Sequence, residues 1–157
     1  MTNELQLLEE ALEKKEKILK QILDKSKLQL KVAEQEDFDV ERFDELVDDK
    51  ADLLEEMTKL DEGFDRTYER IKEELLMHKD EHKKEIAALQ KLISKGVDLG
   101  AQISATEGRT KDKLAVSLTR TKKELAQRRV SSKIATDYYK NTNNLKHVDS
   151  FFLDKKK

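Results

Sequence analysis

The chain has 157 residues, of which 42% are charged and 36% hydrophobic, and it contains no proline, cysteine or tryptophan and only four glycines. Ordinary globular domains are roughly 45–50% apolar and about 25% charged, so this composition favours solvated helices with narrow apolar stripes. The missing cysteines exclude disulfides, thiol catalysis and cysteine-ligated metal sites within this chain. The net charge of −2 hides a gradient, since residues 1–108 carry 18 basic and 29 acidic side chains and residues 109–157 carry 14 and 5.

A first helix is predicted over residues 3–34. Its apolar stripe is interrupted by Lys15 and contains Leu5, Leu8, Leu12, Leu19, Ile22, Ser26 and Ala33. Residues three and four apart lie on one face of a helix, so this stripe should pack against a neighbouring helix.

A second helix is predicted over residues 40–77. Asp39 is its expected N-cap, with Phe38 and Phe43 forming a hydrophobic staple across the helix start. The stripe follows a heptad and contains Phe43, Leu46, Lys50, Leu53, Met57, Leu60, Phe64, Thr67, Ile71 and Leu75. We expect Lys50 to reach water from a seam between two helices, so that Lys50→Leu stabilises the fold modestly.

A third helix is predicted over residues 83–128, after a turn within the polar run 77–84; one continuous helix over 40–105 is the alternative. Its stripe contains Ile86, Leu89, Ile93, Val97, Gly100, Ile103, Leu114, Leu118 and Leu125. Glycine costs about 1 kcal/mol against alanine inside a helix, so residues 96–108 should fray or bend unless a neighbour packs closely. We favour close packing of a neighbouring helix at Gly96 and Gly100 over a membrane dimer motif.

The predicted fold is therefore all-α: an elongated three-helix antiparallel coiled-coil-like bundle over residues 1–129, followed by a short C-terminal helix and tail over 130–157. Four of the eight aromatic residues of the chain fall within the stretch 138–152. Such residues pack back on the bundle, pair with a second copy of the chain or bind a partner. The candidate partner-binding residues are Val130, Ile134, Tyr138, Tyr139, Phe151, Phe152 and Leu153.

Catalytic and cofactor chemistry find little support in the residues. His78 and His82 stand four apart, and on one helix face they and Glu85 would allow a zinc site. Together with Glu81 they also match the short H-x-x-E-H pattern, but side chains on a charged face or in a turn are the preferred interpretation. We expect no enzyme activity, no metal and no cofactor.

Nucleic-acid, membrane and secretory roles are not expected either. The basic stretch 119–129 is attached to an acidic body, which opposes binding to phosphates. No apolar run reaches the length of a membrane span, and the first residues lack the pattern of a secretory signal. The expected location is the cytoplasm.

The second helix carries a family resemblance. Its sequence FDVERFDELVDDKADLLEEMTKL resembles FlgN-type flagellar export chaperones, in which a lysine is followed by paired leucines. The matching residues are Leu46, Lys50, Leu53, Leu54 and Leu60. The C-terminal stretches SSKIATDYYKN and FFLDKKK are similar to tails of the clostridial branch of this family, and the first two helices also resemble FliT-type chaperones.

The resemblance implies a cytosolic helical chaperone without nucleotide or metal. It would hold the terminal segments of hook-associated or filament-cap proteins and present them to the flagellar export gate, with Val130, Ile134, Tyr138 and Tyr139 in the substrate- and gate-binding roles. The glycines at 96–108 depart from the family pattern. The alternative function is a self-associating coiled-coil scaffold or adaptor, and the chain is expected to be a monomer or homodimer.

Overall fold

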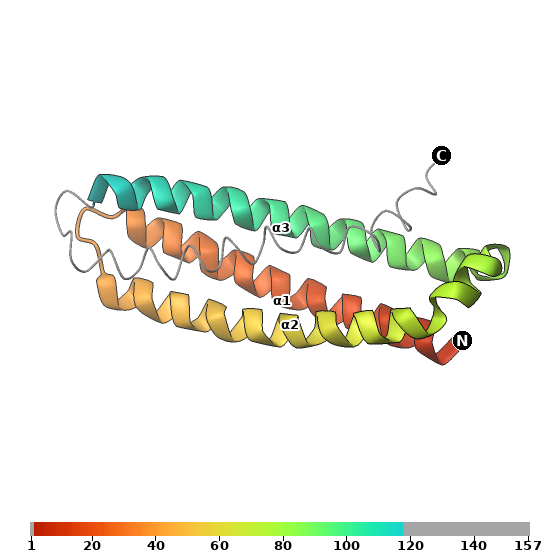
Figure 1. Cartoon of the computed structure of the whole chain (residues 1–157). Helices are drawn as coiled ribbons and strands as arrows, with labels where there is room; N and C mark the ends of the chain where they lie inside the picture. Colours follow the sequence, from red (N-terminus) through yellow and green to blue (C-terminus); the bar gives the residue numbers. More distant parts are fainter. Residues whose placement is uncertain (1, 118–157) are drawn as a thin grey trace.

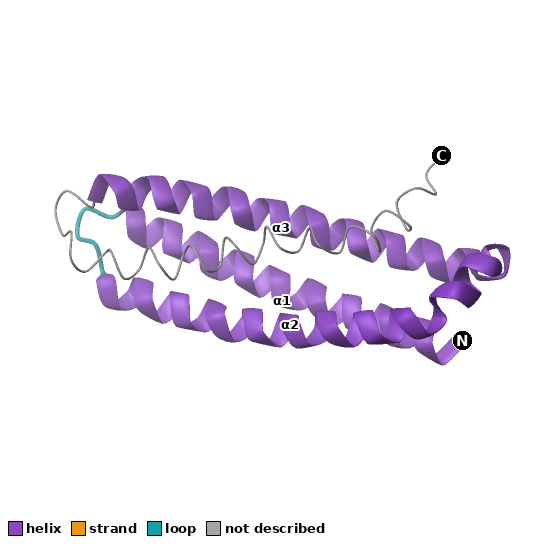
Figure 2. Ribbon diagram, in the orientation of Figure 1, coloured by secondary structure: helices purple, strands orange, loops and turns teal. Residues whose placement is uncertain are grey.

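Three long helices run side by side along an elongated rod in the computed structural model, which describes residues 2–117 (Figure 1). Helix α1 spans Thr2–Glu34, α2 spans Val40–Met77 and α3 spans Lys83–Ser117. A short 3-10 helix, η1, spans Lys79–His82. The helices alternate in direction, so α1 and α3 point the same way and α2 points opposite (Figure 2). The predicted all-α bundle of three long packed helices is confirmed.

The turn between α1 and α2 is fixed by the residues that the sequence singles out. The backbone N–H of Arg42 donates a hydrogen bond to Asp39 Oδ1 at 3.0 Å, which satisfies one of the free donors at the start of α2. The rings of Phe38 and Phe43 lie 5.6 Å apart across this start. The predicted N-cap and hydrophobic staple are therefore present.

Helix α2 ends at the polar run that was predicted to hold a turn. His78 follows the last residue of α2, and its backbone N–H still donates to the carbonyl of Glu74 at 2.9 Å. After η1 the chain reverses into α3. The alternative of one continuous helix over residues 40–105 is wrong.

Helix α3 runs without interruption through Gly96, Gly100 and Gly108, so the expected fraying does not occur at these residues. A Cβ atom added at Gly96 would lie 3.7 Å from Leu19 Cδ1, an ordinary van der Waals contact, and one added at Gly100 or Gly108 would meet nothing within 4 Å. The close packing expected at these positions is thus limited to Gly96. The continuation of α3 to residue 128 lies outside the described residues.

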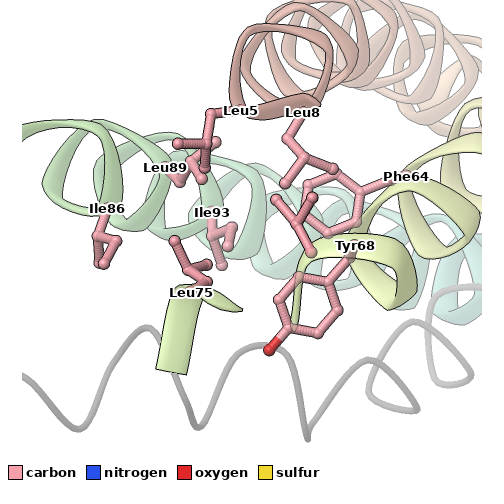
Figure 3. Close-up of a cluster of buried hydrophobic side chains, with 9 residues drawn as sticks. Leu5, Leu8, Phe64, Tyr68, Leu75, Ile86, Leu89 and Ile93 are labelled. Carbon is pink, nitrogen blue, oxygen red and sulfur yellow. The ribbon is translucent and has the colours of Figure 1, made fainter. Parts of the chain in front are cut away.

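The core is built as three apolar clusters along the rod. The first cluster joins all three helices near the start of α1 and contains Leu5, Leu8, Phe64, Tyr68, Ile71, Leu75, Ile86, Leu89 and Ile93 (Figure 3). The middle cluster contains Ile18, Leu19, Ile22, Leu23, Met57 and Ile103. The third, near the α1–α2 turn, contains Val32, Ala33, Phe43, Leu46 and Leu114.

One residue of the stripe predicted for α3 does not face the core. Val97 is 54% exposed and does not belong to the core. Counting from Ile93 in alternating steps of three and four leads instead to Gly96, Gly100, Ile103, Glu107, Thr110 and Leu114. Glu107 and Thr110 are buried at these positions. The core face of α3 is therefore polar between Ile103 and Leu114, where the predicted stripe named no residue.

Candidate functional site

The buried polar groups of the bundle concentrate between the middle and third apolar clusters. Helix α2 contributes Lys50, and the α1 and α3 residues at this level are Ser26, Gln29, Thr106, Glu107 and Thr110, all of them buried. We call these six residues the Lys50 layer. It interrupts the heptad stripes of all three helices at the same height of the rod.

Lys50 is the centre of the layer. Its Nζ donates a hydrogen bond of 2.8 Å to Gln29 Oε1 on α1 and forms an ion pair with Glu107 Oε1 on α3. The side chains of Lys50 and Glu107 are only 5% and 8% exposed. The expectation that Lys50 reaches water from a seam between two helices is therefore wrong: its amine is buried among three helices, because α3 supplies a carboxylate at that height.

Burial and charge act on the Lys50 amine in opposite directions. Removal from water penalises the charged form and lowers the pKa of Lys50 below its ordinary value of 10.5. The attraction and hydrogen bond of Glu107 raise the pKa, but by less than burial lowers it. The ion pair thus offsets only part of the cost of burying the ammonium group.

The hydroxyl groups of the layer either donate hydrogen bonds within their own helix or have no hydrogen-bond partner. Thr106 Oγ1 donates to the carbonyl of Gln102 at 2.8 Å, and Thr110 Oγ1 donates to the carbonyl of Thr106 at 3.1 Å. Ser26 Oγ is buried without a hydrogen-bond partner. None of these bonds ties α3 to another helix, so the Lys50–Glu107 pair is the polar link of the layer between α2 and α3.

This arrangement specifies helix register. A buried lysine requires its carboxylate at one height only, so sliding α3 by a turn would break the Lys50–Glu107 pair and leave the Lys50 amine buried without that carboxylate. The layer is not a source of extra stability, because replacing a buried ion pair by well-packed apolar residues often leaves the stability of the fold unchanged or raises it. Its chemistry is that of a positioning device within the bundle.

A second polar interruption lies between the first and middle clusters. Lys15, which the sequence pattern marked as a break in the first stripe, forms an ion pair of 2.8 Å with Asp61 on α2. Their side chains are 14% and 20% exposed, so this pair lies closer to the surface than the Lys50 pair. It joins α1 to α2.

The other candidate sites fare differently. The seven candidate partner-binding residues and the basic stretch 119–129 lie outside the described residues. His78 follows the end of α2 and η1 is a 3-10 helix, so His78 and His82 do not share one α-helical face as the zinc interpretation required. In the part of the chain from Thr2 to Ser117, no three His, Asp or Glu side chains are grouped to hold a metal ion.

Comparison with known proteins gives no match for this chain. Neither family models, nor curated proteins, nor solved structures match it. Across residues 2–117, no helix combines the length and apolar content needed to cross a membrane.

Proposed function

We propose that the protein is a cytoplasmic flagellar export chaperone of the FlgN type. It binds a terminal helical segment of a hook-associated or filament-cap protein, keeps that protein unassembled and delivers it to the export gate. The role is binding rather than catalysis, and it uses no cofactor, no metal and no nucleic acid.

The observation that carries the proposal is that the apolar stripes of the described helices are largely buried in shared clusters. The three core clusters draw from α1, α2 and α3 of a single chain. The large apolar residues left exposed stand at scattered positions along the helices: Leu7, Leu28, Leu76, Met77, Val97 and Val116. Single exposed apolar residues are normal on a surface and do not form a binding site. Partner binding is therefore assigned to the candidate residues in 130–157.

Charge supports the same division of roles. Residues 2–117 carry 21 basic and 30 acidic side chains, whereas residues 118–157 carry 11 and 4. An acidic body of solvated helices resists self-association and remains soluble with a captured partner. The residues that carry the family resemblance, among them Leu46 and Lys50, are core residues of this body.

The scaffold alternative draws less support from the bundle. A coiled-coil scaffold that self-associates through the same stripes needs those stripes to be open to a second copy. In the described part of the chain, residues from the stripes of all three helices are buried and meet in shared clusters. The chaperone proposal needs no second copy and is compatible with a monomer or a homodimer.

A truncation tests the proposal. A chain ending at Arg129 should keep its helical signal per residue and most of its melting temperature but lose the partners that co-purify with the full-length chain. The double variant Tyr138→Ala with Tyr139→Ala should reproduce part of that loss, and Phe151→Ala with Phe152→Ala should report separately on the end of the tail. The matched control is Val97→Ala with Val116→Ala, two exposed residues of the body.

Mass spectrometry of the co-purified proteins decides between the two functions. Hook-associated or filament-cap proteins support the chaperone, and recovery of the chain itself alone supports the scaffold. Full retention of partners by the chain ending at Arg129 would place the binding surface on the helical body and contradict the proposed division.

A further inference from the structure

The apolar contribution of α3 to the core falls along its length. Three large side chains of α3, Ile86, Leu89 and Ile93, enter the first cluster. In the middle cluster α3 contributes Ile103 and the partly buried Leu99. In the third cluster it contributes Leu114 alone. The end of α3 is thus attached by much less apolar burial than its beginning.

Polar residues fill the remaining core positions at this end. From Thr106 to Thr110 the buried side chains of α3 are those of the Lys50 layer, and the link to α2 across the layer is the Lys50–Glu107 pair. When this section separates from the bundle, both charges regain water, so part of the cost of burying them is recovered. An apolar layer would lose stabilisation on opening without such a return.

The surface beneath this section is formed without α3. Val32 and Ala33 of α1 face Phe43 and Leu46 of α2 in the third cluster. These residues flank the short turn that Asp39 caps, so the pairing of α1 with α2 is local in sequence. The α1–α2 face therefore remains in place when the end of α3 leaves it.

We infer that residues 104–117 of α3, the distal section, detach from the bundle as a unit and uncover an α1–α2 face that binds an amphipathic helix bearing a carboxylate. The incoming helix places that carboxylate against Lys50, where Glu107 stood, and an apolar side chain into the third cluster, where Leu114 stood. A helix without the carboxylate would bury Lys50 unpaired. This inference goes beyond the proposed function and does not depend on it.

Thiol labelling tests the opening in the full-length chain. Because the sequence contains no cysteine, the single variants Thr110→Cys, Leu114→Cys and Leu89→Cys each carry one buried thiol. We expect the thiols at 110 and 114 to label at similar rates, about tenfold or more faster than the thiol at 89, since local openings need less free energy than global unfolding. Their rates should depend weakly on urea, because little surface becomes exposed.

Two outcomes would overturn the opening. If 114 labels much faster than 110, the helix end merely frays. If all three thiols label at one rate with the steep urea dependence of global unfolding, the distal section does not open separately. Adding Glu107→Gln to the Thr110→Cys variant should raise its labelling rate about tenfold or more while the rate at 89, measured in the same Glu107→Gln background, stays unchanged. A change of equal size at both positions would mean general destabilisation and contradict a local role.

A peptide tests the chemistry of the incoming helix. In full-length chain carrying Glu107→Gln and Thr110→Cys, a synthetic peptide copying residues 99–117 should bind the α1–α2 face and raise the labelling rate at 110, because its carboxylate pairs with Lys50 while the displaced distal section exposes its thiol. The same peptide carrying Glu107→Gln is the control and should bind about tenfold or more weakly. Equal binding of the two peptides, or no binding of either, would overturn the assignment of a carboxylate-bearing helix to this face.

Discussion

Two lysines occupy core positions of their helices, and the bundle treats them differently. Lys15 on α1 pairs with Asp61 near the surface, where both side chains keep partial contact with water. Lys50 on α2 is enclosed with Glu107 and Gln29, and its pKa is lowered by burial. The same residue type in the core-facing stripes of two helices therefore has two roles. The third helix decides which role a lysine takes, because α3 supplies Glu107 at the height of Lys50.

The largest difference between the two lysines is expected when the buried amine of Lys50 is removed alone. Lys50→Leu removes the buried amine that pairs with Glu107, and we expect a loss of about 3–5 kcal/mol in the free energy of unfolding measured by urea titration. This is opposite in sign to the modest gain predicted from the sequence, which assumed an amine in contact with water. An unchanged or higher stability would show that Glu107 reaches water without its partner.

Replacing the whole polar link should reverse that loss. With Lys50→Leu, Glu107→Leu and Gln29→Leu combined, no buried charge or amide remains unpaired, and stability should return to the wild-type value or exceed it by about 1–4 kcal/mol. The double variant that retains Gln29 serves as the intermediate, with its amide losing the bond to Lys50. A triple variant as unstable as Lys50→Leu would mean that packing rather than charge sets the cost.

A substitution at Gly108, next to Glu107, measures the effect of helix propensity on stability apart from the effect of the ion pair. Gly108 lies in the interior of α3 with open space around its Cα, so Gly108→Ala should stabilise the protein by about 1 kcal/mol. Gly96→Ala is the comparison, since its new methyl group meets Leu19 at ordinary contact distance. Both changes are read from urea midpoints, and destabilisation at 108 would reveal a contact that the described residues do not explain.

The partly exposed lysine should matter least among the charge changes. Lys15→Leu removes a pair whose members keep contact with water, and Asp61 remains hydrated after the change. We expect a change in stability within about 1 kcal/mol, the range of surface pairs. A loss as large as that of Lys50→Leu would remove the distinction between the two lysines.

Alkaline pH sharpens the contrast further. The pKa of Lys50 is lower in the folded chain than its value of 10.5 in the unfolded chain. Between these two pKa values the unfolded chain binds more protons than the folded chain. The contribution of Lys50 to the free energy of unfolding therefore rises with pH in that range. Tyr68 acts oppositely, since burial raises its pKa above 10.0 and its contribution falls as pH rises beyond that value.

The triple variant without Lys50 retains Tyr68, so the difference between the two proteins isolates the lysine. Urea titrations at several pH values should show wild-type stability gaining on the triple variant as pH rises toward 10.5. A difference that stays flat or reverses would contradict the net effect of burial on the amine.

Much of the fold follows from the sequence because heptad spacing and caps are local signals. The start of α2 was predictable from Asp39 and the two phenylalanines that flank it, and the turn before α3 from its polar composition. The role of Lys50 was not recognised, since the third stripe was followed only through apolar residues. Continuing the heptad spacing from Ile103 leads to Glu107, and this position would have predicted a buried carboxylate as the partner of Lys50. The depth of Lys15 depends on tertiary packing, for which spacing along one helix carries no signal.

The parallel pairing of α1 with α3 has a consequence for how the chain is made. Helix α1 lies close to both other helices, and the partner of one of its faces is the last of the three to be synthesised. At ribosomal rates, the 83 residues between Glu34 and Ser117 take roughly 4–17 s to appear. During that interval a nascent α1–α2 hairpin exposes Leu19, Ile22 and Phe43, which makes it a substrate for general chaperones until α3 emerges.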